Sequence, residues 1–187
     1  MTTRLTLVAA APTAANRAFA FPADEPAEPK ALASVSRLAE RLPRSGRVLT
    51  SPVACARQTA EALGLEATTE PLLRDCDYGR WTGRTLAELE AEDPAAVAEW
   101  LTDPSAAPHG GESLAAVIAR AAGFLETQAA APGQVLAVTH PAIIRAAIVH
   151  VLAAPALSFW RIDIAPLSST RFSGTHGRWN FTALENP

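Results

Sequence analysis

The stretch that decides the fold is residues 135–146, which read VLAVTHPAIIRA. Its first part, Val135–Thr139, is a short apolar run, and such a run is typical of a strand that a parallel sheet buries on both faces. His140 stands at the end of this strand, and Pro141 suits the first position of a following helix. Backbone N–H groups at a helix start, together with the helix dipole, favour an anion beside His140. A histidine that only begins the helix gives the same pattern, so both interpretations stay open.

Strands and helices alternate outward from this stretch. The predicted strands are 5–8, 47–50, one within 65–73, 135–139, and two terminal strands at 160–164 and 179–184. The predicted helices are 31–42, 52–63 with Ser51 as N-cap and Pro52 in first position, 86–90, 95–101, 112–128 and the segment from 141 onward. The order predicts one α/β domain over 1–187. We expect a three-layer sandwich with a central, mostly parallel mixed sheet and helices on both faces.

Two segments are expected to cover the carboxyl ends of the strands. Residues 12–30 contain four prolines, which exclude a continuous helix there and predict a long loop. Residues 80–110 carry short helical patches and a Pro- and Gly-rich end. In an open parallel sheet, ligands bind at the carboxyl ends of the strands. The residues that follow the strands should therefore converge at one binding site beneath these segments.

Composition excludes several classes of protein. The chain has 187 residues and a mass of 19.6 kDa, and 49% of its residues are hydrophobic, which excludes a disordered chain. A net charge of −3 argues against a nucleic-acid binder. The most apolar stretch, 135–157, contains His140, Pro141, Arg145 and His150, so no membrane span is expected.

Cysteine and histidine usage bounds the chemistry further. Only Cys55 and Cys76 are present, which favours a reducing compartment and a cytoplasmic protein. His109, His150 and His176 show no metal-ligand spacing, and no glycine-rich nucleotide loop occurs. We therefore expect neither a metal nor an organic cofactor.

Four motifs in order resemble the histidine phosphatase superfamily, which has a phosphoglycerate-mutase-like fold. They are Ser51–Ala60, Asp75–Gly83, His109–Ser113 and Thr139–Ala146. The resemblance implies a phosphohydrolase that acts on a small phosphorylated, and hence anionic, metabolite. It also implies a possible homodimer.

The resemblance places the catalytic positions. In that family, a histidine after the first strand is phosphorylated, a second histidine and two arginines hold the phosphoryl group, and a carboxylate protonates the leaving oxygen. Here Ala10 occupies the position of the nucleophilic histidine, His140 that of the second histidine and Asp75 that of the acid. Ala9 and Cys55 stand where the family has its two arginines. A chain with Ala10 at this position lacks the nucleophile.

Further substrate-binding candidates are Thr13, Asn16, Arg17, Glu112 and Ala142. Each also has a plain structural interpretation as a turn, helix-start or surface residue. Three functions remain open. The chain is a divergent phosphohydrolase that Ala10 makes inactive, a natural pseudoenzyme that binds a ligand or a protein partner, or a repurposed enzyme. The last would use acid–base chemistry of His140 and Asp75 on a substrate without phosphate.

Overall fold

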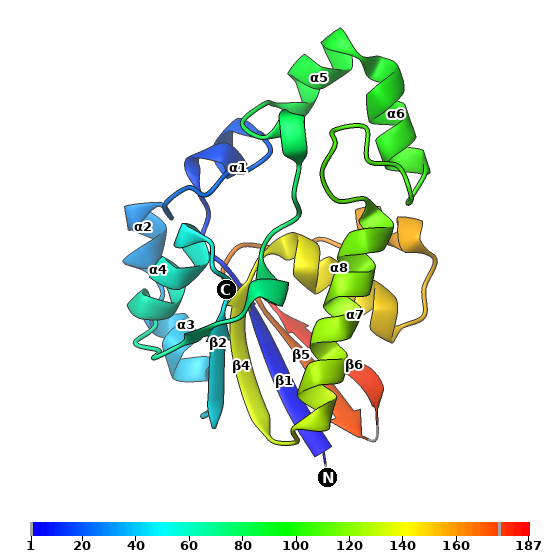
Figure 1. Ribbon diagram of the computed structural model, residues 1–187. Helices are drawn as coiled ribbons and strands as arrows, with labels where there is room; N and C mark the ends of the chain where they lie inside the picture. The colour runs from blue at the N-terminus through cyan, green and yellow to red at the C-terminus, as the bar shows by residue number, and fades with distance from the viewer. Residues whose placement is uncertain (1, 176) are drawn as a thin grey trace.

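The computed structural model describes residues 2–175 and 177–187, so His176 lies outside the described residues. Its centre is a sheet in the order β3-β2-β4-β1-β5-β6 (Figure 1). The strands are β1 Thr2–Ala9, β2 Arg47–Thr50, β3 Thr68–Thr69, β4 Gln134–Thr139, β5 Ser169–Thr175 and β6 Arg178–Glu185. Strands β3, β2, β4 and β1 run parallel, while β5 and β6 pair antiparallel at one side. The predicted mixed sheet, with β1 beside β4, is confirmed.

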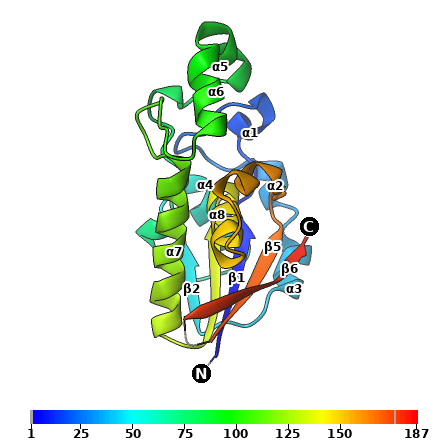
Figure 2. The ribbon, with the colours of Figure 1, turned by 90° about the vertical axis from the view of Figure 1, so that its right-hand side faces the viewer.

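Helices cover both faces of the sheet (Figure 2). They are α1 Ala14–Ala18, α2 Pro29–Leu32, α3 Ser36–Arg41, α4 Ala54–Ala62, α5 Leu86–Glu92, α6 Pro94–Thr102, α7 Leu114–Ala130 and α8 Pro141–Val151. Short 3-10 turns occupy Pro71–Leu73, Gly79–Trp81 and Ala156–Arg161. Helices α7 and α8 lie on one face and α2, α3 and α4 on the other, so the predicted three-layer α/β sandwich is confirmed.

Strand alternation explains why both faces need cover. Leu5 and Leu7 of β1 are buried among α7 and α8, whereas Val8 is buried in the cluster on the α4 side. In strand β4, Val135 is likewise buried on the side of α7 and α8, and Leu136 on the side of α4. Burying one such side chain contributes about 1.5–3 kcal/mol, so this central pair of strands is a rigid base for whatever follows its carboxyl ends.

Several predicted elements are wrong in detail. The predicted strand 160–164 begins in the 3-10 turn Ala156–Arg161, and β5 lies later, at Ser169–Thr175. Trp160 packs against Trp100 with ring centroids 4.6 Å apart, so the apolar alternation there serves contact with another segment. The predicted helix 31–42 is two short helices, α2 and α3, and the third strand is reduced to Thr68–Thr69.

A cap of α5 and α6 stands over the carboxyl edge of the sheet (Figure 1). Its core contains Trp81, Leu89, Val97 and Trp100, and Phe21 from the 12–30 loop packs against it. The ring centroids of Phe21 and Trp100 lie 5.5 Å apart. The loop and the cap are therefore joined by one aromatic cluster.

Candidate functional site

His140 is the centre of the candidate site. It follows β4, serves as N-cap of α8 and is only 4% exposed. Its Nε2 lies 2.8 Å from Ser51 Oγ, and its Nδ1 lies 3.6 Å from Asp75 Oδ2. The imidazole is thus fixed between a hydroxyl and a carboxylate, each carried by a different segment.

Ser51 follows the strand predicted at 47–50 and was expected at the carboxyl edge of the sheet, but its contact with His140 was not predicted. It was expected to cap a helix beginning at Pro52, but α4 begins at Ala54 with Val53 as its N-cap. Ser51 instead follows β2, next to β4 in the sheet, so its hydroxyl reaches His140. Its position at the carboxyl end of a parallel strand is the signal that placed it near the predicted binding site. Because Ser51 is wholly buried, it holds the imidazole and is not an exposed nucleophile.

The hydrogen bonds of Ser51 favour one tautomer of His140. The backbone N–H of Val53 donates to Ser51 Oγ at 3.2 Å, which leaves the hydroxyl proton for His140 Nε2. The ring proton then resides on Nδ1 and faces Asp75. Burial lowers the pKa of His140, and the nearby charge of Asp75 opposes this only in part. The imidazole is accordingly neutral near pH 7.

Asp75 is held in place by a largely buried ion pair behind it. The side chain of Arg120, 7% exposed, donates to both oxygens of Glu112, at 2.8 and 2.7 Å. It also donates to the backbone oxygens of Leu72, Arg74 and Asp75, at 2.8, 2.7 and 3.1 Å. Burial raises the pKa of Glu112, but the bond and charge of Arg120 outweigh it, so the net shift is downward. Glu112 and Arg120 therefore fix the loop that carries Asp75.

A glycine contact tightens the same loop. A Cβ on Gly111 would lie 2.0 Å from the backbone oxygen of Asp77, which no side chain tolerates. The N–H of Glu112 donates to that oxygen at 2.8 Å. His109 supports the turn, since its Nδ1 accepts from the N–H of Gly111 at 3.0 Å. The loops 75–79 and 109–112 are thus in backbone contact.

A small cavity of about 40 Å³ opens beside His140. The residues that line it are Ala10, Ala11, Thr13, Asn16, Pro22, Ala23, Val53, Cys55, Asp75, His140, Pro141 and Pro166. The structure therefore brings together six of the sequence-predicted site residues: Ala10, Thr13, Asn16, Cys55, Asp75 and His140. Part of the 12–30 loop, at Pro22 and Ala23, forms one wall.

Four sequence-predicted site residues do not line this cavity. Ala9 is wholly buried in the core beneath it, and Ala142 is buried in the first turn of α8. The carboxylate of Glu112 is engaged by Arg120, and Arg17 pairs with Glu28 on the surface. Arg17 therefore does not supply the cavity with a replacement positive charge.

The cavity lacks both cations and an activated nucleophile. Its lining contains no arginine or lysine, and its charged group is the carboxylate of Asp75. Burial, with a smaller effect from Asp75, raises the pKa of the Cys55 thiol to about 12, so this group stays protonated. Ala10 offers only a methyl group. The side chains that line the cavity are therefore neutral or negative.

Thr13 and Asn16 are engaged with each other. The N–H and hydroxyl of Thr13 donate to Asn16 Oδ1 at 2.8 and 3.3 Å, and together they form the start of α1. Their local role is the turn that the sequence also allowed. The amide group of Asn16 remains available to the cavity as a donor.

Within residues 2–175 and 177–187, no group of three or more His, Cys, Asp or Glu side chains could hold a metal ion. In the same part of the chain, no helix is long and apolar enough to cross a bilayer.

Two buried neutral histidines predict acid sensitivity. Burial lowers the pKa values of both His109 and His140. The unfolded chain binds protons near pH 6.5 while the folded chain does not, so folding stability is complete above that pH and falls below it. We expect the melting temperature to fall between pH 7.5 and 5.5, measured by calorimetry, and to fall less in His109→Gln. A melting temperature that stays level or rises on acidification contradicts this assignment.

Comparison with known proteins places the chain. The model of the histidine phosphatase superfamily (branch 1) matches residues 5–187. A histidine-to-alanine mutant of phosphoserine phosphatase from Entamoeba histolytica, solved in complex with phosphoserine, superposes with a TM-score of 0.88. That likeness, at 20% identity, covers 98% of this chain and 97% of that one, and it shows the shared fold.

Curated relatives match only in part. The bifunctional protein Rv2228c of Mycobacterium tuberculosis is 39% identical over 77 residues, 39% of this chain and 21% of that protein. Glucosyl-3-phosphoglycerate phosphatase of the same organism is 36% identical over 95 residues, 49% of this chain and 42% of that protein. The matched part thus spans less than half of either relative.

Proposed function

The chain belongs to the histidine phosphatase superfamily, and from that premise we propose that it binds a small ligand beside His140 without hydrolysing a phosphomonoester. The observation that carries the proposal is the lining of the cavity. It combines Ala10 at the nucleophile position, a protonated Cys55 thiol and a complete lack of arginine and lysine. Phosphoryl transfer needs a nucleophile and positive charge around the transferring group, and this cavity offers neither.

The proposed ligand carries an uncharged or cationic group rather than a phosphate. Asp75 is the charged group in the cavity, and His140 beside it is neutral. A phosphate dianion placed there would be repelled at close range, whereas an ammonium or hydroxyl group would be attracted. The free space of about 40 Å³ suits a group of a few atoms.

The second candidate is hydrolysis of a small phosphorylated metabolite. It is favoured by the superfamily and by the named activities of the relatives, a glucosyl-3-phosphoglycerate phosphatase and a phosphoserine phosphatase. The retained Asp75 and His140 also fit this candidate. The missing nucleophile and cations argue against it in this chain.

One experiment separates the two candidates. The wild-type protein is incubated with p-nitrophenyl phosphate, phosphoserine and 3-phosphoglycerate, and released phosphate is measured. We expect no release above that of buffer. Release that disappears in His140→Ala would overturn the proposal in favour of the second candidate.

Binding is tested in parallel with small probes. Ethanolamine and inorganic phosphate are titrated while the amide NMR signals of Ala142 and Cys76 are followed. We expect shifts with ethanolamine that are lost in Asp75→Asn and no shifts with phosphate at these positions. Asp77→Asn, on the same loop but outside the cavity lining, is the matched control. Shifts with phosphate alone contradict the proposed ligand class.

A further inference from the structure

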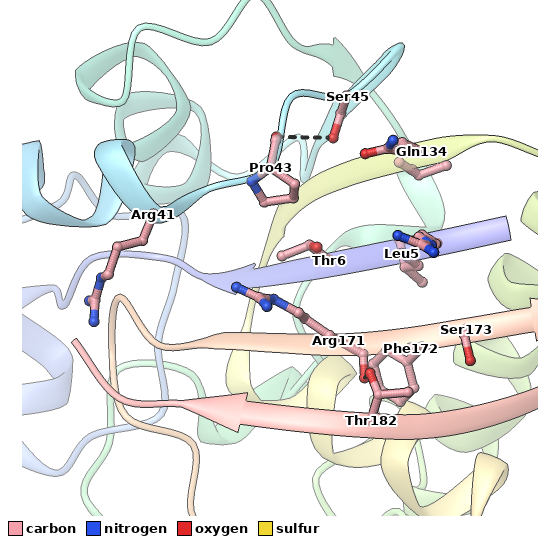
Figure 3. Close-up of a pocket in the computed structure, with 12 residues that line it drawn as sticks. Leu5, Thr6, Arg41, Pro43, Ser45, Gln134, Arg171, Phe172, Ser173 and Thr182 are labelled. Carbon is pink, nitrogen blue, oxygen red and sulfur yellow. Dashed lines mark hydrogen bonds between the residues drawn. The ribbon is translucent and has the colours of Figure 1, made fainter.

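A second, roomier cavity lies away from His140. Its volume is about 540 Å³, within the range of sites that hold small molecules. Strands β1, β4, β5 and β6 form its floor, and the end of α3 with the segment after it forms a wall (Figure 3). It sits at Arg4–Thr6 of β1, while Ala10 beyond the other end of that strand lines the His140 cavity. The two cavities are therefore separate.

The floor of this cavity is polar where the neighbouring part of the same sheet face is apolar. Val8 and Val138 of that face are covered by the helical layer. Helix α3 ends at Arg41, and beyond it hydroxyls and an amide line the cavity. These are Thr6, Gln134, Ser173 and Thr182, joined by Ser45 from the wall. This part of the sheet face therefore offers hydrogen-bonding groups, whereas the neighbouring part packs against helices.

Three arginines and no carboxylate line the cavity. Across residues 2–175 and 177–187, neither Arg4 nor Arg41 forms an ion pair. Arg171 contacts Glu185 through one nitrogen at 3.0 Å, while its buried Nε has no partner among the described residues. In a chain with a net charge of −3, these cations are concentrated where no acid neutralises them fully.

We propose that this cavity binds a small anion with at least two acidic groups. Guanidinium groups present paired donors that match carboxylate and phosphate oxygens. The hydroxyls of Thr6 and Ser173 and the amide of Gln134 supply further donors. Three guanidiniums from β1, α3 and β5 exceed what one singly charged group requires. Phosphate and carboxylate share this chemistry, and the inference does not depend on the function proposed for the His140 cavity.

The test uses inorganic pyrophosphate and citrate as probes in titration calorimetry with the whole protein. We expect at least one of them to bind, and the tighter of the two identifies the acidic group preferred. The double variant Arg4→Gln/Arg41→Gln should weaken that binding at least tenfold. Both side chains are exposed, and neither forms an ion pair with another described residue, so the fold should persist, which the melting temperature checks.

Matched controls decide the outcome. Arg57→Gln removes an exposed arginine from α4, outside the cavity, and should leave the dissociation constant unchanged. His140→Ala should also leave it unchanged, which separates this site from the other cavity. Thr182→Glu should abolish binding by placing a carboxylate among the arginines. Failure of both probes to bind, or equal binding by the double variant and wild type, overturns the proposal.

Discussion

Arg120→Met is expected to destabilise the fold by about 3–5 kcal/mol, because the largely buried Glu112 carboxylate then keeps only the more exposed Arg74 as an ion-pair partner. The side chain of Glu112 is 14% exposed and accepts both of its closest charge-assisted bonds from Arg120. Three backbone oxygens lose a donor at the same time. Urea unfolding followed by circular dichroism measures the loss.

Arg74→Gln is the matched control for this experiment. Arg74 also pairs with Glu112, at 3.1 Å, but its side chain is 45% exposed. A solvent-exposed pair of this kind contributes about 0–1 kcal/mol, so the control should change little. A loss of less than about 1 kcal/mol in Arg120→Met would show that the network does not hold the loop. Arg120→Met/Glu112→Leu should recover part of the lost stability, since it removes the stranded charge.

The second large effect is a gain of phosphatase activity. Ala10→His/Cys55→Arg is expected to hydrolyse p-nitrophenyl phosphate, whereas the wild type does not. An imidazole at position 10 supplies the nucleophile, and a guanidinium at position 55 stabilises charge on the transferring group. Both positions line the cavity beside His140. The phosphoryl group passes to the imidazole as the nitrophenolate leaves, and water then releases phosphate.

Single variants and a blocked variant test this expectation. Removal of one charge-stabilising donor typically costs about 10²–10³ in rate, so Ala10→His alone should be slower by that order. Addition of His140→Ala to the double variant should lower the rate again. A folded double variant that is no faster than wild type would show that more than these two positions separates this cavity from a working one.

Much of the fold could be predicted from the sequence. The apolar run Val135–Thr139 marks β4 because a short, continuous apolar run is typical of a strand that a parallel sheet buries on both faces. Strand β5 escaped prediction because Ser169, Thr170, Ser173 and Gly174 give it a polar, loop-like composition. The strand predicted from the apolar alternation at 160–164 was wrong, since Trp160 packs against Trp100 of the cap instead. Local pattern cannot tell which partner an apolar side chain will contact.

The positions of site residues could be predicted only for those that directly follow strands of the sheet. Ala10 and His140 follow neighbouring parallel strands, so their meeting is a consequence of sheet topology. The bonds of Arg120 to the Asp75 loop join residues 45 to 48 positions apart, and no local pattern contains them. The roles proposed for the site residues stay predictions until the variants are measured.

The aromatic cluster beneath the cap has a kinetic consequence. Phe21 lies among Tyr78, Trp81 and Trp100, with ring centroids 4.8, 5.6 and 5.5 Å away. The loop that walls the His140 cavity and the helices above it cannot separate without exposing these rings to water. They should open as one body, so that a single barrier governs both entry to the cavity and escape from it.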